Sequence, residues 1–267
     1  MSGPRYRPEE IENFVVEFHR DGFCILRDHY PAEKLRAWRE SFLPLFDEHI
    51  KREGDKKNRG TARYYVTLPF IEPFADPQFY EDEDVLAIVG RLAGDDFVMC
   101  QLATDTPLLG SEYQDIHRDT PPLFPESGRE TPPFQLALNF PLVDVTLENG
   151  PFEVARATHV LPKAEALRLI ETGERPLEPI TMNLGDVMIR DVRGLHRGTP
   201  NRSGEPRPMV VIGYSRRWLF RPEVSIRLPR AALAGLSPRA RHMLRYNPVV
   251  ESIDETAFGE TYQAFAY

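Results

Sequence analysis

Apolar positions recur with a helical period in three stretches of the first hundred residues. Residues 8–20 place Ile11, Phe14, Val15 and Phe18 at the i, i+3, i+4 and i+7 spacing of one helix face, after a proline and two acidic residues suited to a helix start. Residues 31–53 and about 82–93 show similar helical patterns. The pattern predicts three amphipathic helices, with a turn and a short strand over residues 21–30.

Beyond about residue 96 the period of the apolar positions changes from about 3.6 to about 2. Short strands without intervening helices are typical of an antiparallel sandwich, a jelly roll or a small barrel. The predicted strands cover residues 97–105, 112–119, 134–145, 151–160, 178–190, 195–200 and 207–218. We expect a single domain with a helical part over about 1–95, a jelly-roll core over about 96–220 and a C-terminal helical extension over about 221–267.

The composition and charge of the chain limit the kinds of partner that it is expected to bind. The chain of 267 residues is 41% hydrophobic, enough for a substantial core, and its net charge of −8 disfavours binding to nucleic acids or anionic membranes. No apolar run approaches the roughly 20 residues that cross a bilayer. Cys24 and Cys100 both lie in apolar, strand-like contexts, which favours buried reduced thiols. We therefore expect a soluble, cytoplasmic protein with a small-molecule partner.

The triplet His117-Arg118-Asp119 needs an explanation. H-R-D also opens the catalytic loop of protein kinases, where an asparagine five residues after the aspartate holds a metal ion. In this chain that position is Phe124, and the sequence has neither a glycine-rich phosphate loop nor a D-F-G motif. The kinase interpretation is therefore excluded.

A metal site is the alternative. Residues i and i+2 of an extended strand point to the same side, so His117 and Asp119 present an imidazole and a carboxylate together. An H-x-D pair by itself is weak, because such pairs are common on sheet surfaces. With His196 as a third ligand, the set leaves three metal positions open, as in non-haem Fe(II) oxygenases that take a co-substrate and O₂. A structural zinc site is normally closed by four ligands.

An arginine strengthens this hypothesis. Arg207 follows His196 by eleven residues, across the turn "GTPNRSGEP" and at the start of the apolar stretch "RPMVVIGYS". A hairpin of this length can return the guanidinium to the metal side. There it could bind the distal carboxylate of a dicarboxylic co-substrate through two hydrogen bonds.

The segments "HRD", "ENGPFEV", "LGDV" and "LHRGTPNRSGEPR" together resemble the phytanoyl-CoA dioxygenase family of Fe(II)- and 2-oxoglutarate-dependent oxygenases. The resemblance covers about residues 8–220 and is strongest over 113–218. It implies a mainly β fold with flanking helices, the double-stranded β-helix or cupin-like jelly roll. It further implies that His117, Asp119 and His196 ligate Fe(II), and that Arg207 holds the C5 carboxylate of 2-oxoglutarate.

The same resemblance implies that O₂ is consumed, that succinate and CO₂ are released, and that a substrate C–H bond is oxidised, most simply by hydroxylation. Halogenation is disfavoured, because related halogenases replace the carboxylate ligand and this chain keeps Asp119. Where family members often have P-G-S-H, this chain reads "ARATH", so His159 receives no metal role.

Family members often carry a polar or aromatic residue near the co-substrate, on the strand after the H-x-D loop. Gln135 and Asn139 are the candidates here, with a strand phase uncertain by one residue. Gln101 and Tyr64 are weaker candidates for the same surroundings.

Three alternatives stay open. The arginines near His196 either form a positive rim for an anionic substrate or are solvated partners of Asp186, Asp191 and Glu205; they are Arg190, Arg193, Arg197 and Arg202. The five prolines of residues 120–133 predict a stiff loop, as a spacer or a lid. Finally, the same ligands could serve a redox-inert metal isomerase or hydrolase, or the chain could be a non-catalytic ligand-binding sandwich.

Overall fold

A computed structural model describes residues 3–53, 59–219 and 225–253 of the chain. Its α-helices are α1 (Pro8–Asp21), α2 (Ala32–Glu53), α3 (Pro77–Tyr80), α4 (Glu83–Ala93), α5 (Lys163–Glu171) and α6 (Pro238–Met243), and its 3₁₀ helices are η1 (Pro125–Ser127) and η3 (Arg230–Gly235). Its strands are β1 (Phe23–Leu26), β2 (Arg63–Thr67), β3 (Phe97–Pro107), β4 (Gln135–Pro141), β5 (Phe152–Ala155), β6 (Leu177–Ile180), β7 (Val187–Asp191), β8 (His196–Gly198), β9 (Met209–Arg216), β10 (Leu228–Pro229) and β11 (Val249–Val250).

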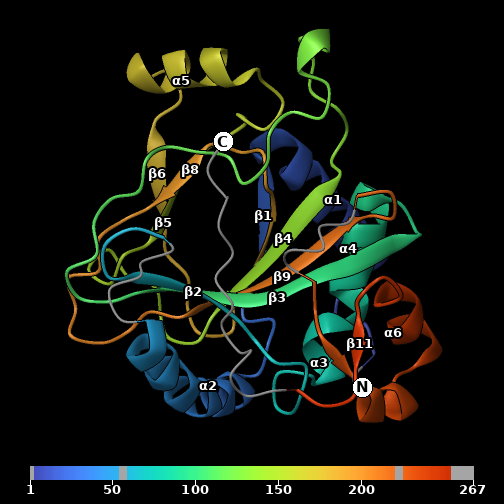
Figure 1. The fold of residues 1–267 in the computed structure, drawn as a ribbon. Helices are drawn as coiled ribbons and strands as arrows, with labels where there is room; N and C mark the ends of the chain where they lie inside the picture. Colours follow the sequence, from blue (N-terminus) through green and yellow to red (C-terminus); the bar gives the residue numbers. More distant parts are fainter. Residues whose placement is uncertain (1–2, 54–58, 220–224, 254–267) are drawn as a thin grey trace.

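Two antiparallel sheets form the jelly roll (Figure 1). The large sheet has the order β1-β7-β4-β9-β3-β2, and the small sheet has the order β6-β5-β8. Neighbours in these sheets are far apart in the chain, so the hydrogen-bonded pairs are long-range. The prediction of a mainly antiparallel β fold with flanking helices is confirmed.

The predicted helices match closely, but two predicted strands were wrong. The helices over 8–20, 31–53 and 82–93 are α1, α2 and α4. The strand predicted over 178–190 is two strands, β6 and β7, in different sheets, because a turn intervenes in which Gly185 has a φ of 113° and the Asp186 amide donates to the Asn183 carbonyl. Residues 112–119 form no regular strand, and His117 makes a single bridge to His196.

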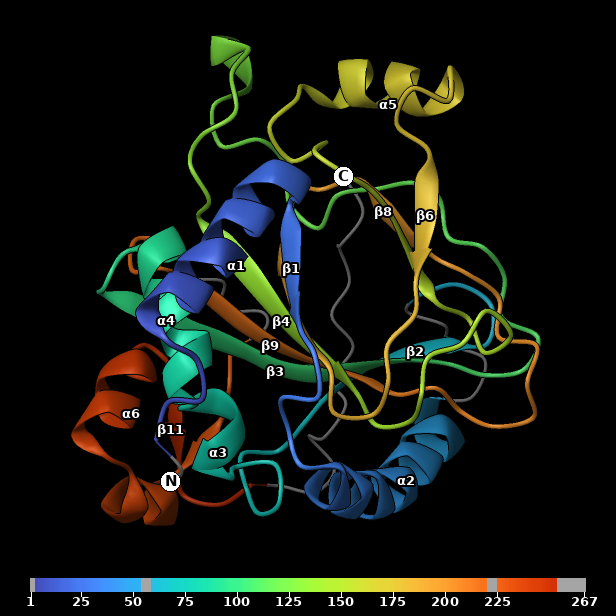
Figure 2. The same cartoon turned by 180° about the vertical axis from the view of Figure 1, so that it is seen from behind.

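The outer face of the large sheet carries the main hydrophobic core. Leu136, Leu138 and Phe140 of β4 alternate toward this face, where α1, α2 and α4 pack. Trp38 of α2 meets Phe140 with ring centroids 5.4 Å apart. Figure 2 shows α1 and α4 lying across β4, β9 and β3. Each large apolar side chain buried here stabilises the fold by about 1.5–3 kcal/mol.

The inner face of the large sheet is more polar and lines a cavity. On β4 the inward residues are Gln135, Ala137 and Asn139, alternating with the core residues. On β3 the alternation is interrupted by a β-bulge between Met99 and Gln101. Because the bulge adds one residue, Met99 faces the core whereas Gln101 faces the cavity.

The C-terminal extension contains less helix than predicted. Residues 225–253 form η3, the short α6 and the parallel pair of β10 and β11. Asn247 anchors them to β3, because its Nδ2 donates to the Met99 carbonyl at 2.8 Å. Residues 221–224 and 254–267 of the predicted extension lie outside the described residues. No described helix is both long and apolar enough to cross a membrane.

Candidate functional site

His117, Asp119 and His196 meet at one end of the small sheet. The backbones of His117 and His196 exchange two hydrogen bonds of 3.0 and 3.1 Å, so their rings lie with centroids 4.4 Å apart. Asp119 Oδ1 lies 3.4 Å from Nε2 of His196 and 3.8 Å from Nε2 of His117. One ligand atom from each residue lies within 4.8 Å of the other two, a spacing that can hold a metal ion.

Backbone carbonyls fix both imidazoles. His117 Nδ1 lies 2.7 Å from the Asp115 carbonyl, and His196 Nδ1 lies 2.9 Å from the Gly194 carbonyl. A carbonyl can only accept, so each Nδ1 carries the proton and each Nε2 keeps its lone pair. The two Nε2 atoms that face Asp119 are therefore the ones free to bind a metal, which is the usual arrangement around histidine ligands.

The charge states also suit a metal. Burial and the neighbouring His196 lower the pKa of His117 to about 4. Burial by itself would raise the pKa of Asp119, but Arg190 and the two histidines outweigh it and hold that pKa well below its usual range. At neutral pH His117 is thus neutral and Asp119 ionised, the forms that bind metal ions.

The triad opens into a cavity between the two sheets. The empty space of the cavity is about 770 Å³ when the solvent at its open mouth is included. Large-sheet residues form one wall, and Phe152 of β5 and Gly198 of β8 belong to the opposite side. Gln101, Gln135, Asn139 and Arg207, all predicted from sequence to lie near a co-substrate, line this cavity with the triad.

Arg207 is the most unusual of these residues, because it is a buried cation without a carboxylate partner among the described residues. It is 2% exposed, and its Nη2 donates to the Gly150 carbonyl at 2.7 Å, while its Nε has no partner within residues 3–53, 59–219 and 225–253. Burial lowers its pKa to about 10, so it stays charged at neutral pH. Nearby Asp105 pairs instead with Arg63 at 2.9 Å. A buried unpaired guanidinium fits an anionic ligand.

The three polar candidates differ in their partners. Gln135 Oε1 is buried without a partner among the described residues. Gln101 hydrogen-bonds the Tyr65 hydroxyl. Both polar atoms of the Asn139 side chain are hydrogen-bonded. Its Nδ2 donates to the Val210 carbonyl at 3.2 Å, and its Oδ1 accepts from Arg190 at 3.1 Å.

Tyr64, a weaker candidate from the sequence, does not line the cavity, but the adjacent Tyr65 does. The ring of Tyr64 lies on the outer side of the large sheet against Phe46, with centroids 5.8 Å apart. The register of β2 against β3 decides this, and it cannot be read from two adjacent tyrosines. His159 lies outside the metal-ligand group and packs near Phe18 instead.

Neither interpretation of the arginine run holds for all its members. Arg190 lines the cavity and contacts Asp119, which the sequence interpretation missed. Arg193 is buried and pairs with Asp191 at 2.6 Å, as one interpretation proposed, but it is not solvated. Arg197 pairs with Glu153. A signal for Arg190 existed, since the alternation of "VMIRD" sets it on the face opposite Val187 and Ile189.

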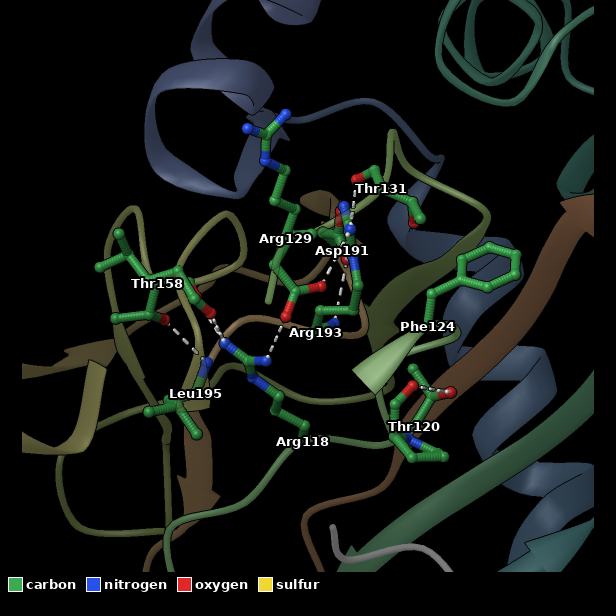
Figure 3. Close-up of polar contacts among 12 residues, drawn as sticks. Arg118, Thr120, Phe124, Arg129, Thr131, Thr158, Asp191, Arg193 and Leu195 are labelled. Carbon is green, nitrogen blue, oxygen red and sulfur yellow. Dashed lines mark hydrogen bonds and ion pairs between the residues drawn. The ribbon is translucent and has the colours of Figure 1, made fainter. Parts of the chain in front are cut away.

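The proline-rich loop 120–133 is fastened at its base. Arg118 points away from the proposed metal ligands and binds Glu130 at 2.9 Å and the Thr158 carbonyl at 2.9 Å. Glu130 also accepts from Arg193, which donates to the Thr131 carbonyl (Figure 3). No residue of 120–133 lines the cavity, so the loop does not cover the site in this structure.

Comparisons with known proteins agree on fold and family. A model of the phytanoyl-CoA dioxygenase (PhyH) family matches residues 18–209. The iron/alpha-ketoglutarate-dependent dioxygenase ausO of Aspergillus calidoustus is 25% identical over 144 residues, 52% of this chain and 48% of that protein. The chain therefore spans about half the length of this curated relative.

Solved structures share the jelly roll. The epimerase SnoN from nogalamycin biosynthesis, in complex with Fe3+, alpha ketoglutarate and nogalamycin RO, has a TM-score of 0.59 at 18% identity, covering 79% of this chain and 85% of that one. HygX from Streptomyces hygroscopicus, with nickel, 2-oxoglutarate and hygromycin B bound, has a TM-score of 0.58 at 16% identity, covering 78% and 88%. Iron and alpha-ketoglutarate, the element and the co-substrate predicted for this chain, stand in the names of ausO and of the SnoN complex, whereas the HygX structure holds nickel with 2-oxoglutarate.

Proposed function

This chain belongs to the phytanoyl-CoA dioxygenase family, and we propose that it is an Fe(II)- and 2-oxoglutarate-dependent oxygenase that hydroxylates a C–H bond of a small molecule. One observation carries the proposal. The cavity that receives the three convergent ligand atoms of His117, Asp119 and His196 also holds the buried, unpaired cation Arg207. A site for metal binding alone has no need of that cation.

The donor set fits Fe(II). Two imidazole nitrogens and one carboxylate, without thiolates, match the facial arrangement of non-haem iron oxygenases. When bound, Fe(II) with 2-oxoglutarate and O₂ supplies the oxidation, in which the co-substrate becomes succinate and CO₂ while a substrate C–H bond is oxidised. His117, Asp119 and His196 hold the metal, and the carbonyls of Asp115 and Gly194 keep the two imidazoles aimed at it.

Arg207 fits the far carboxylate of the co-substrate. Its guanidinium is oriented by the Gly150 carbonyl. Glycine is required at position 150 by the neighbouring backbone, since a Cβ there would lie 2.8 Å from the Thr199 carbonyl oxygen. Arg207 Nε is left for an incoming acceptor. The apolar walls near the metal, including Phe152 and Val211, exclude water and give the substrate an apolar surface.

For the substrate we propose only its class, a small molecule. The relatives' titles name nogalamycin RO and hygromycin B as ligands of those proteins, and SnoN as an epimerase. The mixture of apolar walls and a few convergent polar groups in the cavity supports a small molecule here as well. We further propose one catalytic domain, because the flanking helices share the core of the large sheet. We also propose a cytoplasmic location, in keeping with the buried positions of Cys24 and Cys100.

The first test of the proposal is the visible metal-to-ligand charge-transfer band. Anaerobic protein loaded with Fe(II) should develop a weak band when 2-oxoglutarate is added, and the His117→Ala and His196→Ala proteins should not. Wild-type protein that binds one metal ion but develops no band would instead support the redox-inert metal enzyme. Wild-type protein that binds no metal would favour the non-catalytic sandwich.

Arg207→Met should separate the co-substrate from the metal. Loss of a buried, charge-assisted contact worth about 3 kcal/mol should weaken 2-oxoglutarate binding roughly a hundredfold, with metal affinity kept. Titration of the charge-transfer band measures the affinity for 2-oxoglutarate, and Mn(II) binding measures the affinity for the metal. Arg197→Met is the matched control, because Arg197 pairs with Glu153 beside the same site and should leave both unchanged. Unchanged 2-oxoglutarate affinity in Arg207→Met would remove the carboxylate assignment.

A further inference from the structure

Arg190 contacts the carboxylate of the proposed metal ligand Asp119 from the side opposite the histidines. Its Nη2 donates to Asp119 Oδ2 at 2.7 Å, and the two side chains are 12% and 9% exposed. Its guanidinium also lies over the ring of Phe152, 5.2 Å from the centroid. An ion pair buried to this extent is oriented, since neither partner is free to turn into solvent.

A second residue fixes the guanidinium in its plane. Asn139 Oδ1 accepts from Arg190 Nε at 3.1 Å, and Asn139 Nδ2 donates to the Val210 carbonyl at 3.2 Å. The amide orientation follows from these partners, because a carbonyl accepts only from the nitrogen. The antiparallel register of β4 and β7 pairs Asn139 with Met188, so Arg190 and Asn139 project side by side on the inner face.

These contacts give the two carboxylate oxygens of Asp119 different partners. Oδ2 is engaged by Arg190, whereas Oδ1 faces the Nε2 atoms of His117 and His196. An unrestrained carboxylate can bind a metal through both oxygens and so occupy two coordination positions. An Fe(II) oxygenase site needs three open positions for its co-substrate and O₂.

We propose that Arg190, oriented by Asn139, is a positioning residue that makes Asp119 a ligand through Oδ1 alone and thereby keeps three metal positions open. This proposal rests on the proposed function, because only an oxygenase needs the three open metal positions. It also gives Asn139 a role different from the direct co-substrate contact expected from the sequence.

Plain charge compensation is the competing explanation, and it makes a different prediction for lysine. Arg190→Lys keeps the positive charge but offers a point charge without the planar fork that bonds Asp119 and Asn139 together. If charge compensation is the whole role, lysine restores the wild-type site. If positioning is the role, lysine behaves like the uncharged Arg190→Met.

Mn(II) provides a readout that does not depend on turnover. Protein-bound Mn(II) enhances the relaxation of water protons in proportion to the water molecules it carries. Three waters in the wild type should become two when Asp119 binds through both oxygens, so the enhancement should fall by about a third in Arg190→Met and Arg190→Lys. The affinity of 2-oxoglutarate, titrated by the charge-transfer band with Fe(II), should fall about tenfold in the same variants.

Two further variants keep the test decisive. Asn139→Leu leaves Arg190 and Asp119 in place but removes the orienting oxygen, so it should lower the Mn(II) relaxation enhancement even if Arg190→Met fails to fold. Arg197→Met should match the wild type. Wild-type enhancement in folded, Mn(II)-loaded Arg190→Met, or in Asn139→Leu if the former does not fold, would overturn the proposal.

The outcomes separate this proposal from the proposed function. If wild-type protein shows no charge-transfer band, the oxygenase assignment fails, while the Mn(II) contrast between wild type and the Arg190 variants still tests positioning. If the band is present and the Mn(II) enhancement is unchanged in the variants, the positioning role fails alone. Recovery of the wild-type enhancement in Arg190→Lys would likewise overturn positioning in favour of charge compensation.

Discussion

Single backbone carbonyls orient the imidazoles of the two proposed histidine ligands. The carbonyls of Asp115 and Gly194 each accept a hydrogen bond from Nδ1 of the histidine two residues further on, so both Nε2 atoms turn toward Asp119. Each carbonyl is two residues from its histidine, so this part of the site is local in sequence. Because His117 is buried, its imidazole resists protonation.

The metal-free protein should therefore lose stability in mild acid. His117 has a pKa of about 4 in the folded chain against 6.5 for an ordinary histidine, so between these values the unfolded chain binds a proton that the folded chain does not. The free energy of unfolding should fall as the pH drops from 6.5 to about 4, by up to roughly 3 kcal/mol from this residue.

Urea titrations at several pH values, with a chelator present, measure this dependence. His117→Gln removes the group and should give a shallower dependence than the wild type over the same pH range. Equal slopes for the two proteins would contradict the assignment of the low pKa to His117.

At the scale of elements, one bulge and one buried ion network shape the surroundings of the site. The bulge in β3 turns Gln101 inward, where regular alternation from Met99 would have put it in the core. The network of Arg118, Glu130, Arg193 and Asp191 closes the base of the loop 120–133. Since Arg118 stands between the two proposed ligands His117 and Asp119, the loop base and the proposed metal site share one segment of the chain.

Glu130→Gln should loosen that loop. It removes the carboxylate from two buried arginines and should lower the free energy of unfolding by about 3 kcal/mol. It should also speed tryptic cleavage after the exposed Arg129. Glu126→Gln, an exposed change in the same loop, serves as the control. Wild-type cleavage rates and stability in Glu130→Gln would refute the structural role of the network.

At the scale of the whole molecule, the proposed metal ligands connect the two sheets. His196 belongs to the small sheet, whereas the Asp119 amide donates to the Val192 carbonyl just beyond β7 of the large sheet. A metal held by both residues opposes separation of the sheets. The cavity also carries arginines in a chain whose net charge is −8, so the local charge of the site differs from that of the whole molecule.

Metal binding should therefore raise the melting temperature. Mn(II) at a hundredfold excess over its dissociation constant should stabilise the fold by about 2.7 kcal/mol, which corresponds to a shift of about 5 °C for a chain of this size. Scanning calorimetry with and without Mn(II) measures it. His196→Ala should show little or no shift, and a full shift in that variant would mean that the metal binds elsewhere.

Elements with a strong local period could be predicted from the sequence, and those set by turns could not. The helix over residues 8–20 has its apolar face and its start signal within one short stretch, and it is α1. The stretch 178–190 is continuous in its apolar pattern, yet it turns at Asn183–Asp186 and joins two sheets. The helix α5 was not foreseen, because its nine residues give too short a pattern.

The sequence by itself determined what depends on near neighbours: the helices, the change to strands, the H-x-D pair and the spacing from His196 to Arg207. Tertiary structure decided which face each inner residue takes and which distant residues meet. The contact of Arg190 with Asp119 joins positions 71 apart, and that with Asn139 joins positions 51 apart. Such contacts follow from strand register and bulges, which pairing across the sheet fixes and local sequence does not.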